Sequence, residues 1–198
     1  MANHGPNAAA SGGKALQSEA PMTLKSATLI PALTHAASLG ISLREMTARD
    51  MQFLAQVYRS TREEELALTP WNEDQKHAFI SMQFRAQHEH YQAHYPDALW
   101  LIIQRSGEAI GRLYLERWQS EHRIIDIALL PAHRGAGIGG AILRDLMDEA
   151  SAANKAVGIH VEKANPAMAL YHRLGFVTVE DKGVYDLLRR STDAKAIR

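Results

Sequence analysis

The stretch Leu129–Gly140 constrains the fold of this 198-residue sequence most, because an expected strand passes there through a glycine-rich turn into an expected helix. Four of six consecutive residues are glycines, namely Gly135, Gly137, Gly139 and Gly140. Glycines let backbone N–H groups approach an anion closely, and the dipole at the start of a helix favours negative charge. The stretch therefore predicts a site for a phosphate or pyrophosphate, with the charge of Arg134 beside it.

Hydrophobic periodicity on both sides of the turn predicts an α/β domain. Helical spacing of apolar residues predicts helices over residues 50–66 and 73–93, after the glycine turn from Ile142, and over 166–174. Apolar and alternating runs predict strands over residues 41–46, 99–104, 109–118, 123–130, 157–163, 176–181 and 183–190. The order β-α-α-β-β-β-α-β-α-β-β indicates a mixed, mostly antiparallel sheet flanked by helices.

The patterned sequence occupies residues 41–190, where we expect the domain. Residues 1–40 are rich in Ala, Ser, Gly, Asn and Pro and predict a disordered N-terminal extension. Residues 191–198 are expected to form a flexible C-terminal tail. No apolar run reaches the roughly 18 residues of a membrane-spanning helix, so no membrane partner is expected.

Charge and cysteine content disfavour several classes of function. The 22 basic and 22 acidic residues balance, so binding of nucleic acid through phosphate neutralisation is not expected. The chain has no cysteine, which excludes disulfides, thiolate metal sites and a cysteine nucleophile. The composition fits a reducing, cytoplasmic location.

Two common phosphate-binding patterns fit the turn poorly. Gly135-x-Gly137-x-x-Gly140, with Glu162 about 20 residues later, matches the dinucleotide fingerprint. That fold needs further βαβ units, whereas the strands before the turn form a hairpin and too few elements follow it. A Walker loop needs Lys after its last glycine, where this chain has Ala141. A dinucleotide-dependent oxidoreductase is therefore a distant alternative.

A third pattern fits both the turn and its surroundings. Residues Arg134–Gly139 read R-x-x-G-x-G and resemble the Q/R-x-x-G-x-G/A motif of the GNAT superfamily of acyl-CoA-dependent N-acetyltransferases. Residues Ala167–Phe176 are similar to that family's A-x-x-L-Y-x-x-x-G-F motif. The expected element order over residues 41–190 also resembles the GNAT fold. The chain thus looks like a GNAT N-acetyltransferase of a bacterial subgroup.

The resemblance implies acetyl-CoA as co-substrate and no metal. The glycine turn would hold the pyrophosphate, and the end of the strand before it would pair with the pantetheine arm and supply an oxyanion donor. Tyr171 would protonate the leaving thiolate. Where the family commonly has Asn, this chain has Ala164, so the adjacent Asn165 is expected to take its place. The implied cofactor-binding residues are Ile127, Ala128, Leu129, Arg134, Gly135, Ala136, Gly137, Ile138, Gly139, Gly140, Asn165 and Tyr171.

Three residues are candidates for the base that accepts the amine proton. Alternation in their strand puts His160 and Glu162 on one face, opposite the apolar residues and toward the cleft of a GNAT sheet. A histidine suits proton transfer near neutral pH, and relatives that act on protein N-termini carry a Glu near this position. Asp126 is the third candidate, or else a structural acid paired with Arg112 or Arg123. An ordered water chain could also replace a dedicated base.

In the GNAT fold, the first two helices line the acceptor site. We therefore expect the wall to include Trp71, Met82, Gln83 and Tyr91. His90 and His94 lie one helical turn apart, but a histidine pair on a polar helix face does not predict a metal site. The acceptor would be the amine of a small molecule or peptide, and homodimers are common in the family. The main alternative is a non-catalytic acyl-CoA-binding module, which would keep the turn without needing Tyr171.

Overall fold

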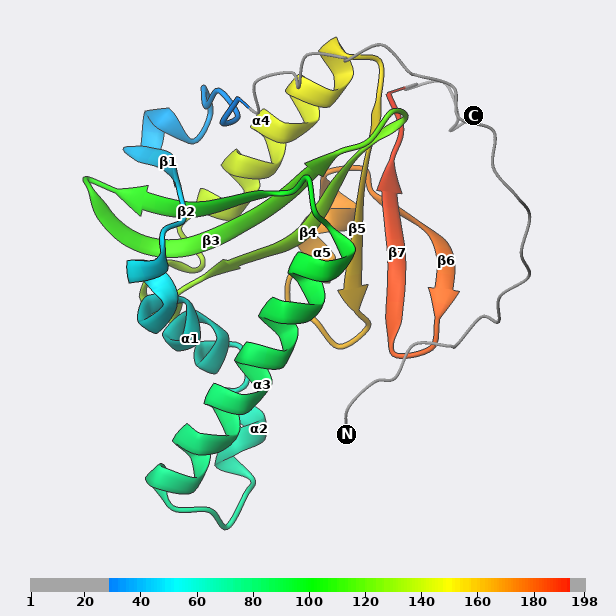
Figure 1. Cartoon of the computed structure of the whole chain (residues 1–198). Coiled ribbons are helices and arrows are strands. Elements are labelled where there is room, and N and C mark those ends of the chain that lie inside the picture. The colour runs from blue at the N-terminus through cyan, green and yellow to red at the C-terminus, as the bar shows by residue number, and fades with distance from the viewer. Residues whose placement is uncertain (1–28, 193–198) are drawn as a thin grey trace, which may run out of the picture.

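A twisted seven-stranded sheet forms the centre of the structure, a computed structural model that describes residues 29–192 (Figure 1). Its strands follow the spatial order β1-β2-β3-β4-β5-β7-β6, and every neighbouring pair is antiparallel except β4 and β5. This arrangement confirms the predicted mixed, mostly antiparallel sheet. The strands are β1 (Ile41–Glu45), β2 (Leu99–Arg105), β3 (Glu108–Arg117), β4 (Glu121–Leu129), β5 (Ala156–Glu162), β6 (Val177–Lys182) and β7 (Tyr185–Arg190).

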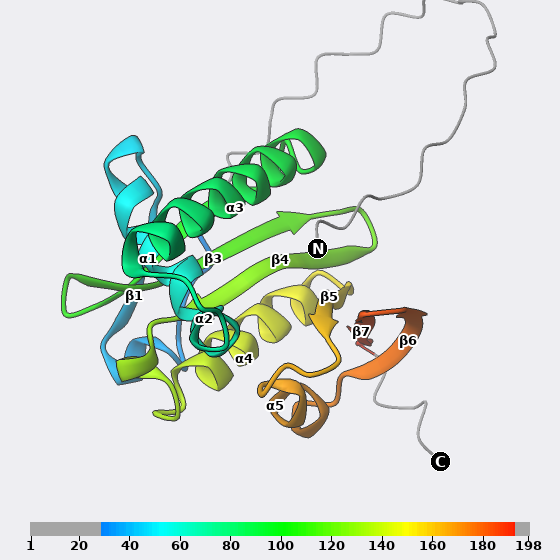
Figure 2. The same ribbon diagram turned by 90° about the horizontal axis from the view of Figure 1, so that it is seen from below.

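Helices cover both faces of the sheet (Figure 2). One face carries α1 (Met51–Ser60), α2 (Glu63–Ala67) and α3 (Glu73–His94), and the other carries α4 (Ile138–Ala152) and α5 (Met168–Arg173). The larger apolar core joins the sheet to α4 and α5 and includes Leu113, Ile142 and Phe176. The second core packs α1 and α3 against Ile102 and Tyr114. Burial of apolar side chains on both faces fixes the sheet between two helical layers.

The segment predicted as one long helix forms two, α1 and α2, because the chain turns at Thr61 and Arg62. The hydroxyls of Ser60 and Thr61 donate hydrogen bonds to the carbonyls of Val57 and Tyr58, each at 2.7 Å. Hydroxyl groups that bond to the preceding turn compete with the continuation of a helix. Arg62 then leaves the helical conformation with φ of −119°, and its side chain reaches β5.

The residues that precede β1 pack against α4. The backbone N–H groups of residues 34–36 donate hydrogen bonds to the carboxylate of Asp145, and Ala36 is completely buried. The end of the expected N-terminal extension therefore packs on the domain. The rest of that extension and the end of the expected C-terminal tail, residues 1–28 and 193–198, lie outside the described residues.

β4 and β5 separate partway along β4, and their separation is visible in Figure 1. Their parallel ladder ends at the pair Ile124 and Ile159. On the other side of β4, the register against β3 skips Ile125, which forms a β-bulge that bends the strand. From Asp126 to Leu129 the ladder of β4 involves β3 and not β5. The backbone groups of β4 that face the gap are thus free to pair with an extended ligand.

Candidate active site

A cavity of about 160 Å³ lies where β4 and β5 separate. It brings together side chains from both helical layers and from β4, β5 and β7, including four tyrosines, two arginines and two carboxylates. All of the sequence-derived candidates for proton transfer are among them. The lining residues are Tyr58, Thr61, Arg62, Gln87, Tyr91, Arg112, Ile125, Asp126, Ile127, Ala128, Ile159, His160, Val161, Glu162, Asn165, Tyr171 and Tyr185.

The glycine-rich turn forms the start of α4. Gly135 and Gly137 have φ of 73° and 79°, left-handed values that residues with a side chain rarely adopt. A Cβ at either position would meet no atom within 4 Å, so the space over the turn is open. The first N–H groups of any helix lack partners within that helix and are available to an anion. The open backbone and the helix start suit a diphosphate.

Arg134 ties this turn to two other elements. Its Nε donates to the carbonyl of Leu129 at 2.8 Å, at the end of β4. Its guanidinium also donates to the carbonyl and hydroxyl of Ser60, at 3.1 and 3.0 Å, at the end of α1. All three groups are neutral oxygen acceptors, so the charge of Arg134 stays available to a nearby anion.

Tyr171 lies on α5 and is only 4% exposed, with its ring 5.6 Å from that of Phe176. α5 lies beside the start of α4, where a Cβ at Gly140 would make an ordinary van der Waals contact with a methyl of Leu170, at 3.4 Å. Burial and the charge of Asp126 raise the pKa of Tyr171 well above its usual value. The hydroxyl therefore keeps its proton and remains a hydrogen-bond donor at neutral and alkaline pH.

Asp126 is held by the buried guanidinium of Arg112, at 2.6 Å. Arg112 is 2% exposed and also donates to Gln87 at 3.1 Å, while its charge lies over the rings of Tyr58 and Tyr114. The ion pair that sequence analysis offered as the alternative role of Asp126 is thus present. The carboxylate of Asp126 is engaged in neutralising a buried arginine, which argues against Asp126 as the base.

His160 and Glu162 occupy different surroundings on β5. The Nδ1 of His160 lies 3.1 Å from a guanidinium nitrogen of Arg123, which donates to it. Loss of hydration and the charge of Arg123 lower the pKa of His160, so the ring is neutral near pH 7. Glu162 accepts from Tyr185 at 3.1 Å and from Arg62 at 3.3 Å, both through Oε1. Its Oε2 has no hydrogen-bond partner among residues 29–192.

Asn165 lies at the edge of the cavity, and its side-chain oxygen accepts from the N–H of Ala167 at 2.8 Å. This bond helps to start α5, which carries Tyr171. The side-chain amide group of Asn165 can still donate to a ligand. Ile127 and Ala128 also line the cavity, whereas Leu129 and the glycine turn lie outside its lining.

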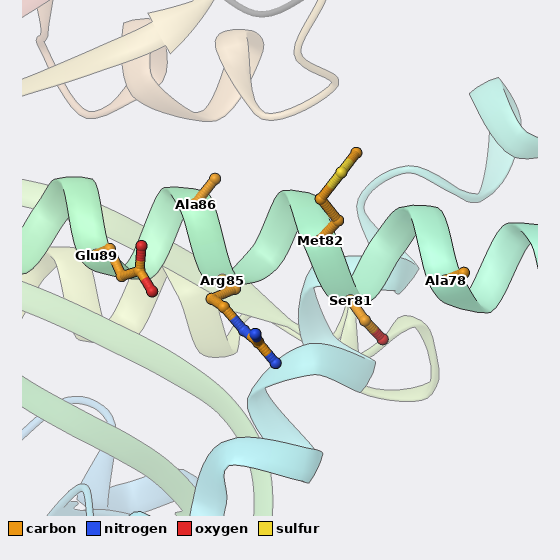
Figure 3. Close-up of a pocket in the computed structure, with 6 residues that line it drawn as sticks. All are labelled: Ala78, Ser81, Met82, Arg85, Ala86 and Glu89. Atoms are coloured by element: carbon orange, nitrogen blue, oxygen red, sulfur yellow. The ribbon is translucent and has the colours of Figure 1, made fainter.

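Only Tyr91 of the four expected wall residues lines the cavity. Trp71 is 36% exposed and packs on Phe79, with ring centroids 5.0 Å apart. Gln83 is absent from the lining, and Met82, 59% exposed, lines a separate hollow of about 440 Å³ on α3. Figure 3 shows that the six residues of this hollow all come from that one helix. It shares no lining residue with the cavity that holds the proton-transfer candidates.

Several cavity residues have no recognisable signal in the sequence. Arg62 and Tyr185 reach Glu162 from distant parts of the chain, and Gln87 reaches Arg112 from α3. A single polar residue on a helix or strand gives no spacing pattern, so only the topology brings them together.

Within the described residues no cluster of three metal-ligating side chains occurs, and no helix there is long and apolar enough to cross a membrane.

Comparison with known proteins shows the family to which the chain belongs. The model of the acetyltransferase (GNAT) family matches residues 54–176, more than half of the chain. The match includes the turn that leads into α4 and extends to Phe176, the end of the second motif found in the sequence. A search of curated proteins found no match.

Solved structures share the fold at low sequence identity. PaiA N-acetyltransferase from Thermoplasma acidophilum, in complex with coenzyme A, is 17% identical over 76% of this chain and 98% of its own, with a TM-score of 0.57. PH1933 from Pyrococcus horikoshii OT3 is 17% identical over 77% and 99%, with a TM-score of 0.58. An acetyltransferase from Thermus thermophilus is 18% identical over 77% and 97%, with a TM-score of 0.55. At these identities the likeness shows the fold alone.

Proposed function

Because this chain belongs to the GNAT acetyltransferase family, we propose that it transfers an acetyl group from acetyl-CoA to a primary amine by direct attack in a ternary complex. The observation that carries the proposal is the position of Tyr171. Its buried ring lines the cavity at the point where β4 loses β5 as a partner. A non-catalytic binding module would need no proton donor there.

The chain's own residues fit acetyl-CoA as co-substrate. The open turn at Gly135 and Gly137 leaves room for a diphosphate against backbone N–H groups at the start of α4. Ile127 and Ala128 line the cavity on the part of β4 that pairs with β3 but has no β5 partner. The backbone groups on this open side of β4 can pair with the amides of the pantetheine arm. One such N–H can also donate to the oxyanion that forms during acyl transfer.

The reaction requires two proton movements. The amine nitrogen attacks the thioester carbonyl carbon, a C–N bond forms, and the C–S bond breaks. One proton must leave the nitrogen and another must reach the sulfur. We assign Glu162 to accept the first proton because its Oε2 is free of partners within the described part of the chain, whereas the Nδ1 of His160 is occupied by Arg123. We assign Tyr171 to donate the second.

The absence of cysteine supports direct attack, since the chain has no thiol that could carry the acetyl group between donor and acceptor. The test is incubation of the full chain with acetyl-CoA and a panel of amines, with release of CoA thiol and the mass of the product as readouts. Stoichiometric thiol and acetylated amine are expected. Tight CoA binding without turnover on any amine would instead favour the non-catalytic acyl-CoA-binding module.

A further inference from the structure

Arg62 contributes a positive charge to the cavity from the turn between α1 and α2. Its guanidinium donates to Glu162 at 3.3 Å and to Glu65 at 2.8 Å, and it lies 5.9 Å from the ring centre of Tyr58. The side chain of Glu65 is 67% exposed. A hydrogen bond to so exposed a carboxylate is easily exchanged for another, because water screens the pair.

The second arginine of the cavity behaves differently. Arg112 is buried and donates to Asp126 at 2.6 Å and to Gln87 at 3.1 Å, so withdrawing it from them would leave its own buried charge without these partners. Among the described residues, Arg62 is therefore the cavity arginine that can turn toward an incoming anion. Arginine suits a carboxylate in particular because its planar fork donates two parallel hydrogen bonds.

We propose that the acceptor is a free amino acid, whose carboxylate binds Arg62 while its amine faces Glu162. This inference rests on the proposed function and names the substrate class of the same site. Tyr185 continues to hold Oε1 of Glu162 when Arg62 turns away, so that carboxylate keeps a partner. Burial and the charge of Glu162 raise the pKa of Tyr185, so its hydroxyl stays protonated as the donor.

The arrangement separates a free amino acid from the N-terminus of a peptide. In a peptide the group next to the amine-bearing carbon is a neutral amide, which cannot form a charged pair with Arg62. The cavity of about 160 Å³ also admits a small acceptor more readily than a folded chain. A carboxylate beside the reacting amine is thus the feature that Arg62 would select.

The test uses matched acceptors that differ only in this group. Glycine, leucine, methionine and glutamine are each compared with their own amides, and kcat/KM is measured for the full chain with acetyl-CoA. We expect the acids to be preferred by about tenfold or more, the worth of one charge-assisted hydrogen bond. In Arg62→Gln the ratio of kcat/KM for each acid to that for its amide should fall to about one.

Arg59→Gln is the matched control, because Arg59 lies on α1, three residues before Arg62, and does not line the cavity. Like Arg62 it pairs with carboxylates, those of Glu63 and Glu73. It should keep the preference for acids. Equal kcat/KM for acids and amides in the wild type overturns the inference, and so does an equal loss on both in Arg62→Gln. Either result leaves the proposed acetyl transfer intact.

A second measurement does not depend on turnover. Calorimetric titration of the CoA-loaded protein with methionine and with methioninamide reports binding alone. Tighter binding of the acid in the wild type, lost in Arg62→Gln, supports the role of Arg62 whether or not acetylated product forms. A lack of acetylated product with every amine would overturn the proposed function and not the role of Arg62. Equal binding of acid and amide rejects the role of Arg62.

Discussion

The carboxylate of Asp145 in α4 accepts a hydrogen bond from the backbone N–H of Ala36 at 2.9 Å, although more than one hundred residues separate them. The N–H groups of Thr34 and His35 bind the same carboxylate at 2.9 and 2.8 Å. Asp145 is 4% exposed and Ala36 is completely buried. One side chain thus fixes the segment that leads into β1.

Asp145→Asn should destabilise the fold, because the new amide presents a donor to N–H groups that need an acceptor. A buried donor left without a partner costs about 1–3 kcal/mol, so the free energy of unfolding in urea should fall by that amount. Asp148→Asn is the control: its side chain is 70% exposed and contacts the same segment through His35 at 2.9 Å. It should change stability by less than about 0.5 kcal/mol. Equal stability of the two variants contradicts the anchoring role of Asp145.

Apolar runs and helical periodicity predicted the fold because the strands and helices bury their apolar side chains in the two cores. The strand over β3, the hairpin with β2 and the stripe of α4 all follow from side-chain patterns that are local in sequence. The break between α1 and α2 does not, since it depends on the hydroxyls of Ser60 and Thr61 bonding to the preceding turn. The same residue types occur within many unbroken helices.

Tyr171→Phe should lower kcat by about a hundredfold or more at neutral pH, as expected for the loss of a general acid, and leave CoA affinity unchanged. Tyr114→Phe is a matched control, because Tyr114 is equally buried, lies outside the cavity lining, and its hydroxyl has no partner in the part of the chain that the structure describes. It should leave kcat unaffected. Single-turnover rates, together with CoA binding by fluorescence, separate the two effects. Full activity of Tyr171→Phe would remove the assigned role.

Gly137→Leu should weaken CoA binding by about tenfold or more, since a side chain would fill the open space over the turn and block close approach of the diphosphate. The positive φ of 79° adds strain of about 1–2 kcal/mol. Gly107→Leu controls for that strain, because Gly107 has φ of 85° and open space in the β2–β3 hairpin. Calorimetric CoA titration should show a loss at Gly137 alone. Similar affinities in the two variants would refute the turn as the diphosphate site.

The candidate site could be predicted from sequence only where its residues lie in a motif. The turn before α4 and Tyr171 belong to such stretches, and alternation predicts that His160 and Glu162 share one strand face. Their relative merit as a base depends on partners from other elements, Arg123 on β4 and Tyr185 on β7. Contacts between distant segments leave no local pattern from which to predict them.

Glu162→Gln should lower kcat by about a hundredfold or more, because an amide cannot accept the amine proton. His160→Gln should have little effect, since glutamine can still accept the hydrogen bond from Arg123 that occupies Nδ1. The pKa of His160 is lowered by loss of hydration and by Arg123, so the ring gains a proton only below its usual range. If His160 were the base, kcat/KM would fall only at acidic pH, where the ring gains a proton. His160→Gln would then remove this acidic limb from the pH profile of kcat/KM. We expect pH profiles of kcat/KM from about pH 5 to 9 to coincide for His160→Gln and the wild type. A normal rate in Glu162→Gln, with loss of the acidic limb in His160→Gln, would transfer the base role to His160.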